Sequence, residues 1–61
     1  MKYFVVVTED YTEEEVDRHG PIADLRAAQR KADEVFDYYS VANRAVAIAV
    51  VDEDGNEVDE P

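Results

Sequence analysis

Carboxylates are the side chains in this sequence that could do chemistry. There are 16 aspartates and glutamates against six lysines and arginines in 61 residues, which gives a formal charge of −10. Carboxylates can bind metal cations, transfer protons in catalysis or attract a basic partner. Which of these roles applies depends on how the carboxylates are spaced and on what surrounds them.

One stretch has the spacing of a calcium loop. Asp52-Glu53-Asp54-Gly55-Asn56 resembles the start of an EF-hand loop, whose first, third and fifth residues supply oxygen ligands. The match then fails, because Glu57 stands where the loop needs glycine and the chain ends before the bidentate glutamate. Asp-Gly is also a strong hairpin signal. We therefore expect a turn here, with weak calcium binding as the alternative, and no metal or other cofactor.

Catalysis has little support in the sequence. His19 is the single histidine, and without cysteine the candidate nucleophiles are Thr8, Thr12 and Ser40. A catalytic triad needs both a nucleophile and an orienting partner around the histidine. Paired carboxylates need a concave and desolvated pocket, which a domain of this size rarely encloses. We expect a non-enzymatic protein without catalytic residues, in which His19 is exposed near a helix end.

The remaining composition limits the location and the partners of the protein. The absence of cysteine excludes disulfides and fits a reducing cytoplasm. The apolar run near the N-terminus is too short for a signal peptide, and no stretch has the length of a transmembrane helix. The negative charge repels anionic membranes and the phosphates of DNA and RNA. We expect a cytoplasmic protein that binds neither membrane nor nucleic acid directly.

Two strands and one long helix are indicated by the apolar pattern. Residues 2–8 are aromatic and β-branched on both faces, which predicts a strand covered on both sides. Apolar side chains at three- and four-residue spacing predict the main helix over residues 25–40, with Asp24 as its N-cap. Residues 44–52 predict the second strand, and a short third strand at 56–59 should follow the Asp-Gly turn.

The acidic stretch between the first strand and the main helix is harder to assign. Thr12 and Glu15 have the spacing of a capping box, in which the two side chains satisfy free backbone amides at a helix start. This predicts a short helix near residues 13–18 that is closed by Gly20. A solvated loop is the alternative.

These elements predict a single α+β domain over residues 1–61, in the order β-α-β-β, with one main helix packed on a three-stranded sheet. The helix should cover one face of the sheet. The other face, which carries a stripe of alanines, would remain open to water. Because an open apolar face marks an interaction site and the core is small, we expect a homodimer through this face.

Twelve of the carboxylates lie in two segments, one after each of the first two predicted strands. If these strands are parallel, both segments leave the same edge of the sheet and form one negative pole. If the strands are antiparallel, the segments lie at opposite ends. We expect the merged pole to bind a partner, with Tyr11 and Tyr38 as surface aromatics. The expected partner-binding residues are Glu9, Asp10, Tyr11, Glu13, Glu14, Glu15, Asp17, Asp52, Glu53, Asp54 and Glu57.

These features predict an acidic protein-interaction module that acts as an inhibitor or decoy. A negative pole on a small scaffold can occupy the groove in which a basic protein binds nucleic acid. In size, acidity and lack of catalytic groups the chain resembles the phage-encoded DNA mimics that block restriction or CRISPR effectors. That class shares no motif, so the resemblance assigns no residue a role. The alternative is a salt-adapted, halophilic homodimer whose carboxylates serve only solubility.

Overall fold

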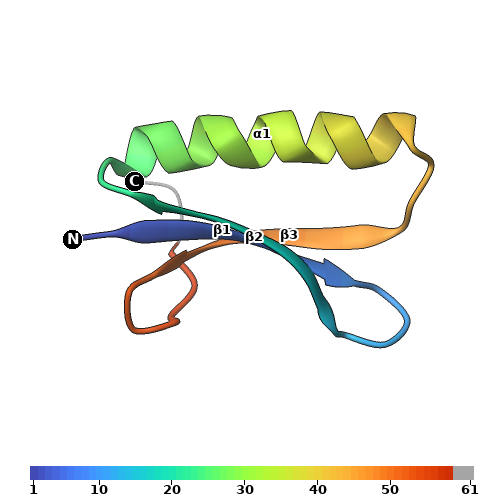
Figure 1. The fold of residues 1–61 in the computed structure, drawn as a ribbon, viewed down its shortest axis with the longest axis horizontal. Coiled ribbons are helices and arrows are strands. Elements are labelled where there is room, and N and C mark those ends of the chain that lie inside the picture. Colours follow the sequence, from blue (N-terminus) through green and yellow to red (C-terminus); the bar gives the residue numbers. More distant parts are fainter. Residues whose placement is uncertain (59–61) are drawn as a thin grey trace.

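The fold is a single helix packed on one face of a three-stranded antiparallel sheet (Figure 1). The computed structural model describes residues 1–58. Its elements are β1 (Tyr3–Glu9), β2 (Glu15–Ile22), α1 (Leu25–Val41) and β3 (Val46–Asp52), and the strand order is β2-β1-β3. The predicted α+β class, with one main helix on three strands, is confirmed. The predicted element order is wrong, because the remaining strand precedes the helix instead of ending the chain.

Strand β2 occupies the stretch for which a short helix or a loop was predicted. The Thr12 hydroxyl accepts a hydrogen bond from the Glu14 amide at 3.3 Å, so it closes a tight turn instead of capping a helix. Glu13 adopts a positive φ of 58°, and the Glu9 amide donates to the Glu14 carbonyl at 2.9 Å. These bonds reverse the chain, and β2 then pairs with β1.

The predicted third strand at 56–59 is reduced to a single bridge. Glu57 bridges to Val51, and the Val58 amide donates to the Val50 carbonyl at 2.8 Å. The Gly55 amide closes the predicted turn by donating to the Asp52 carbonyl at 3.0 Å. The last predicted residue of this strand lies outside the described residues. The segment 56–58 therefore borders only the end of β3.

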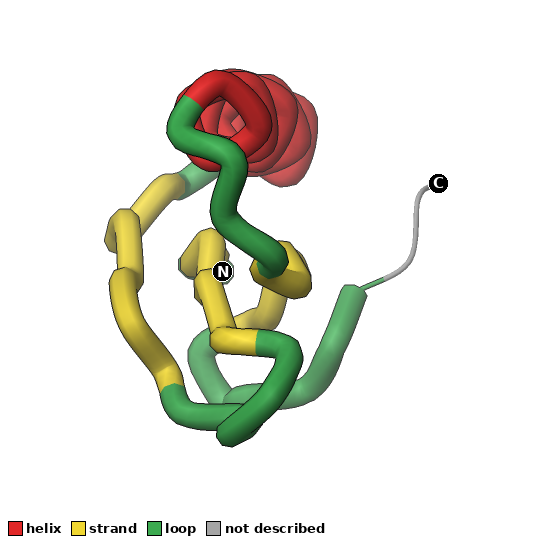
Figure 2. The backbone as a smooth tube through the Cα atoms, turned by 90° about the vertical axis from the view of Figure 1, so that its right-hand side faces the viewer, coloured by secondary structure: helices red, strands yellow, loops and turns green. Residues whose placement is uncertain are grey.

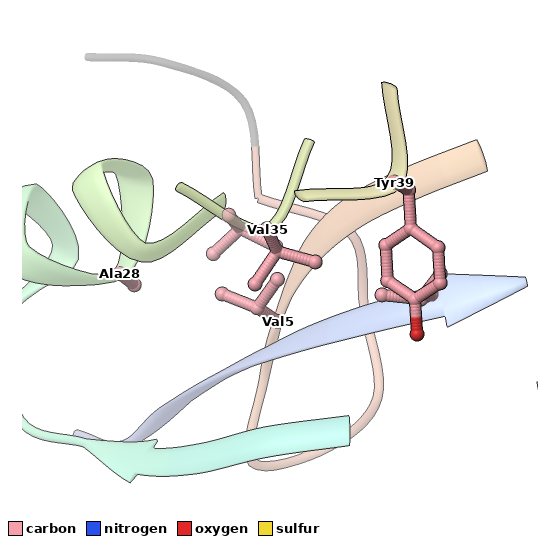
Figure 3. Close-up of a cluster of buried hydrophobic side chains, with 6 residues drawn as sticks. Val5, Ala28, Val35 and Tyr39 are labelled. Carbon is pink, nitrogen blue, oxygen red and sulfur yellow. The ribbon is translucent and has the colours of Figure 1, made fainter. Parts of the chain in front are cut away.

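Helix α1 agrees with its prediction. Its N-cap is Asp24, whose carboxylate accepts a hydrogen bond from the Arg26 amide at 3.2 Å. Figure 3 shows Val35 of its inner face pointing toward Val5 of β1, and Tyr39 of the same face reaching down from the helix toward the sheet. The core is small, and its buried members are Val5, Val7, Ala28, Val35, Tyr39 and Val50.

The helix lies above β1 and β3, and β2 extends to one side of it (Figure 2). The strands under the helix are therefore better buried than β2. Val5 and Val7 of β1 and Val50 of β3 are buried, whereas no residue of β2 is buried. β2 also carries one extra residue in each of two places where its register with β1 shifts. Such bulges and the charged residues of β2 protect an exposed edge from pairing with other strands.

The second face of the sheet has no helix or strand over it in the described part of the chain. Phe4, Val6 and Val51 are half-buried there, and Ala47 is exposed. The Arg18 guanidinium lies 5.4 Å from the centre of the Phe4 ring and partly covers it. The expectation of cover on both faces of β1 is therefore wrong for the single chain, whereas the expected open face is present.

Candidate interaction surface

The two acidic segments lie at opposite ends of the molecule. β1 and β3 are antiparallel, so that Glu9 pairs with Val46 at one end and Tyr3 pairs with Asp52 at the other. Figure 1 shows the turn after β1 and the turn after β3 at opposite ends of the strands. The expectation of one merged negative pole is wrong. The structure instead has two separate acidic regions.

The larger region is the hairpin tip, which we define as residues Glu9–Asp17. It brings together seven of the predicted partner-binding residues: Glu9, Asp10, Tyr11, Glu13, Glu14, Glu15 and Asp17. Tyr11 is 87% exposed at the turn between the two strands. The segment contains six carboxylates and no lysine or arginine. Backbone hydrogen bonds close the turn, because the Glu9 amide donates to the Glu14 carbonyl and the Glu13 amide donates to the Glu9 carbonyl.

One carboxylate of the hairpin tip is neutralised by its neighbour on β2. Arg18 donates hydrogen bonds to Glu15 Oε1 from Nη2 at 2.8 Å and from Nε at 3.2 Å. These hydrogen bonds, together with the charge of Glu15, raise the pKa of the Arg18 guanidinium above its usual value. Both side chains are about half exposed, so the pair contributes little to stability. It does reduce the charge that the tip can offer to a partner.

The smaller acidic region is the C-terminal turn, which we define as residues 52–57. It holds the other four predicted partner-binding residues: Asp52, Glu53, Asp54 and Glu57. Asp52 Oδ1 accepts hydrogen bonds from the Asp54 amide at 3.0 Å and from the Asn56 amide at 2.9 Å. The Asp52 carboxylate thus organises the turn. Within residues 1–58 no group of three or more acidic or histidine side chains is placed to hold a metal ion.

A groove that the sequence did not indicate lies between β2 and α1. It has a volume of about 300 Å³, and Asp17, His19, Lys31 and Tyr38 are among its lining residues. His19 Nε2 lies 2.9 Å from Asp17 Oδ2, and the His19 side chain is 29% exposed. His19 is therefore a half-buried strand residue, which corrects the expectation of an exposed position near a helix end.

The histidine and carboxylate of this groove form a pair that nucleophilic catalysis could use if a hydroxyl lay beside it. Neither threonine nor serine lines the groove. The Thr8 hydroxyl donates to the Ala47 carbonyl at 3.3 Å, and Ser40 lines a separate groove between α1 and β3. The groove therefore contains a contact between histidine and carboxylate side chains but no assembled catalytic triad. Only the alternation of Asp17 and His19 along a strand could have indicated this contact between their side chains, and the strand itself was not predicted.

Two exposed aromatic residues mark the flanks of α1. Tyr38 is 69% exposed beside β2, as expected for a surface aromatic, and its ring packs edge-on against Tyr39. Phe36 belongs to the apolar stripe that predicted the helix, but it is 58% exposed and lies on the flank next to β3. The apolar stripe of α1 is thus wider than the part of the helix that the small sheet covers.

No helix in residues 1–58 combines the length and apolar character needed to cross a bilayer. The comparisons with known proteins give no identity: the chain matches no family model, no curated protein and no solved structure.

Proposed function

We propose that this chain is a non-enzymatic, cytoplasmic interaction module that binds a basic, nucleic-acid-binding protein through its hairpin tip. The observation that carries the proposal is the hydrogen-bonded turn that holds six carboxylates, one of them paired with Arg18, beside an exposed Tyr11. Carboxylates at this tip attract lysine and arginine side chains that otherwise contact phosphates. Tyr11 supplies the apolar contact area that aromatic residues give to interfaces. The module then acts as an inhibitor or decoy.

The proposed binding surface is limited to the hairpin tip and does not include the carboxylates of the C-terminal turn. Because the C-terminal turn lies at the opposite end of the molecule, it cannot contact the same small basic surface as the hairpin tip. Binding should therefore depend on the tip alone. That difference allows a test in which equal amounts of charge are removed from the two ends.

The test compares two double variants that have the same net charge. E13Q/E14Q removes two carboxylates from the hairpin tip, and E53Q/D54N removes two from the C-terminal turn. Each variant, attached through its N-terminus, is used to capture proteins from a cell lysate, and duplex DNA is then added as a competitor. We expect the tip variant to bind the captured protein about 2- to 30-fold more weakly, because exposed ion pairs contribute about 0.2–1 kcal/mol each.

The matched control should bind like the original chain, and duplex DNA should displace the captured protein from it. If both double variants bind equally well, the hairpin tip is not the binding surface. If DNA does not compete, the captured protein does not use its nucleic-acid site and the decoy function is wrong.

The second candidate function is a salt-adapted homodimer whose carboxylates serve solubility and whose open sheet face forms the interface. The placement of acid at both ends of the molecule favours this candidate. A melting curve against sodium chloride separates the two. Screening of exposed charges is nearly complete by about 0.5 M salt, so the decoy should gain stability only up to that range. A salt-adapted protein should continue to gain stability up to molar concentrations.

A further inference from the structure

The outer edge of β3 is the least charged part of the sheet perimeter. Residues 46–51 are all apolar, although more than a third of the whole chain is charged. Exposed edge strands usually carry charges, prolines or bulges that prevent pairing with another chain. β2, the other edge of this sheet, has all three, whereas β3 pairs with β1 without a shift in register.

Backbone groups at the start of β3 point away from β1 and are unpaired within residues 1–58. In an antiparallel strand, alternate residues present both their amide and their carbonyl to the same side. The Val50 carbonyl and the Asp52 amide bond outward, to Val58 and Asn56 respectively. It follows that Val46 and Ile48 also present their amides and carbonyls outward, away from β1. Within residues 1–58 these groups have no hydrogen-bond partner.

The position of α1 fits a second copy on this edge. The helix lies above β1 and β3, as Figure 2 shows, and adjacent strands are about 4.8 Å apart. If two β3 strands pair in antiparallel fashion, the two-fold axis runs perpendicular to the sheet and both helices lie on the same face. Each helix axis is then about one strand spacing from the two-fold axis. The two helices would be about 10 Å apart, which matches the spacing of directly packed helices.

Phe36 supplies an apolar contact for such a pair of helices. Its side chain is 58% exposed on the flank of α1 that adjoins β3, where it lines a groove with Tyr39 and Arg44. A second helix at packing distance would cover this ring. A basic partner would gain nothing from an uncharged edge, whereas a second copy brings an equally uncharged strand and a second Phe36.

We infer that the chain forms a homodimer through antiparallel pairing of two β3 strands, with α1 packed against its counterpart beside them. In the register that uses the outward groups of Val46 and Ile48, Ala47 lies opposite Ala47 of the other copy, and Val46 and Ile48 exchange about four main-chain hydrogen bonds with it. The result is a continuous six-stranded sheet with both helices on one face. This interface differs from the open sheet face, and both hairpin tips remain free at its periphery.

The mass in solution, measured by light scattering in 0.5 M sodium chloride, is the first test. High salt is used because two chains of charge −10 repel each other. We expect twice the chain mass of 6.9 kDa at concentrations of about 0.1–1 mM. A monomer throughout this range overturns the inference.

Three variants identify the interface. F36E places a charge where the two helices would meet and should return the protein to a monomer. Y38E is the matched control, because Tyr38 is also a largely exposed aromatic and lies on the other flank of α1, and it should remain a dimer. T8E places a charge on the open sheet face and should also remain a dimer. A dimer that is broken by T8E but not by F36E uses the open face and refutes the inference.

Amide hydrogen exchange gives a readout that does not depend on mass. The Val46 and Ile48 amides should be protected in the original chain and in Y38E. In F36E they should exchange rapidly, while the Ala47 amide, which faces β1, keeps its protection. Circular dichroism confirms that F36E is folded. Rapid exchange of the Val46 and Ile48 amides in a chain of dimeric mass would show that the β3 edge is not paired, which overturns the inference.

Discussion

Replacement of Gly20 by alanine should destabilise the fold far more than the same replacement at Gly55. Gly20 lies in β2 with a φ of 136°, and a Cβ atom there would lie 2.8 Å from the Tyr3 carbonyl oxygen and 2.8 Å from Phe4 Cδ1. Gly55 also has a positive φ, of 85°, but no atom lies within 4 Å of the position of its Cβ. The two variants therefore share the backbone strain and differ in the clash.

The size of the effect follows from these contacts. Backbone strain of this kind costs about 1–3 kcal/mol, and forcing extra atoms into a packed region adds about 1–3 kcal/mol. The Tyr3 carbonyl belongs to the backbone of the central strand, so the clash cannot be relieved by a side-chain rotation. We expect G20A to lose about 2–6 kcal/mol of the free energy of unfolding, and G55A about 1–3 kcal/mol. A domain of 61 residues has only roughly 3–9 kcal/mol in total.

Urea and thermal unfolding, followed by circular dichroism, measure both variants against the original chain. Each kcal/mol corresponds to about 4–8 °C in Tm for a domain of this size. G55A should therefore melt about 4–24 °C lower, and G20A should melt about twice as far below the original as G55A or be unfolded at 25 °C. Equal losses for the two variants would refute the close approach of β2 to Phe4.

Three further predictions test the elements that position the surface. V35A should lose about 2 kcal/mol in urea unfolding because its side chain is 5% exposed, whereas V41A, at 89% exposed, should change the stability by less than about 0.5 kcal/mol. D24A removes the N-cap and should cost about 1 kcal/mol, detected as a lower Tm and as faster amide exchange in the first turn of α1. D52A removes the acceptor that holds the C-terminal turn, so the Asn56 amide should exchange faster while the rest of the sheet is unchanged.

The sequence was sufficient for the elements whose apolar pattern is strong. β1, α1 and β3 were predicted within two residues at each end, because β-branched runs and a helical stripe depend on local composition. β2 was missed because its residues are mostly polar and include Gly20 and Pro21. Its strand conformation comes from pairing with β1, a tertiary interaction that overrides local preference.

The prediction of a single acidic surface failed because β2 was not predicted. With β2 inserted before the helix, the chain no longer forms a parallel β-α-β unit, and β1 and β3 become antiparallel. The acidic residues were identified correctly as two segments, but their convergence required the parallel topology. The Asp17–His19 pair was also hidden, because its two side chains lie on one face only if the segment is a strand.

The direction of β1 has a practical consequence for experiments on charge. The strand runs from the N-terminal end of the molecule, where Met1 is 76% exposed, to the turn that bears Tyr11. The seven residues of β1 between these points span about 23 Å, which is nearly three Debye lengths at physiological ionic strength. A sensor chip coupled through the α-amino group would thus be attached at the end of the molecule opposite the hairpin tip. Its own surface potential would have decayed before it reached the acidic turn, so measured binding would report the protein rather than the support.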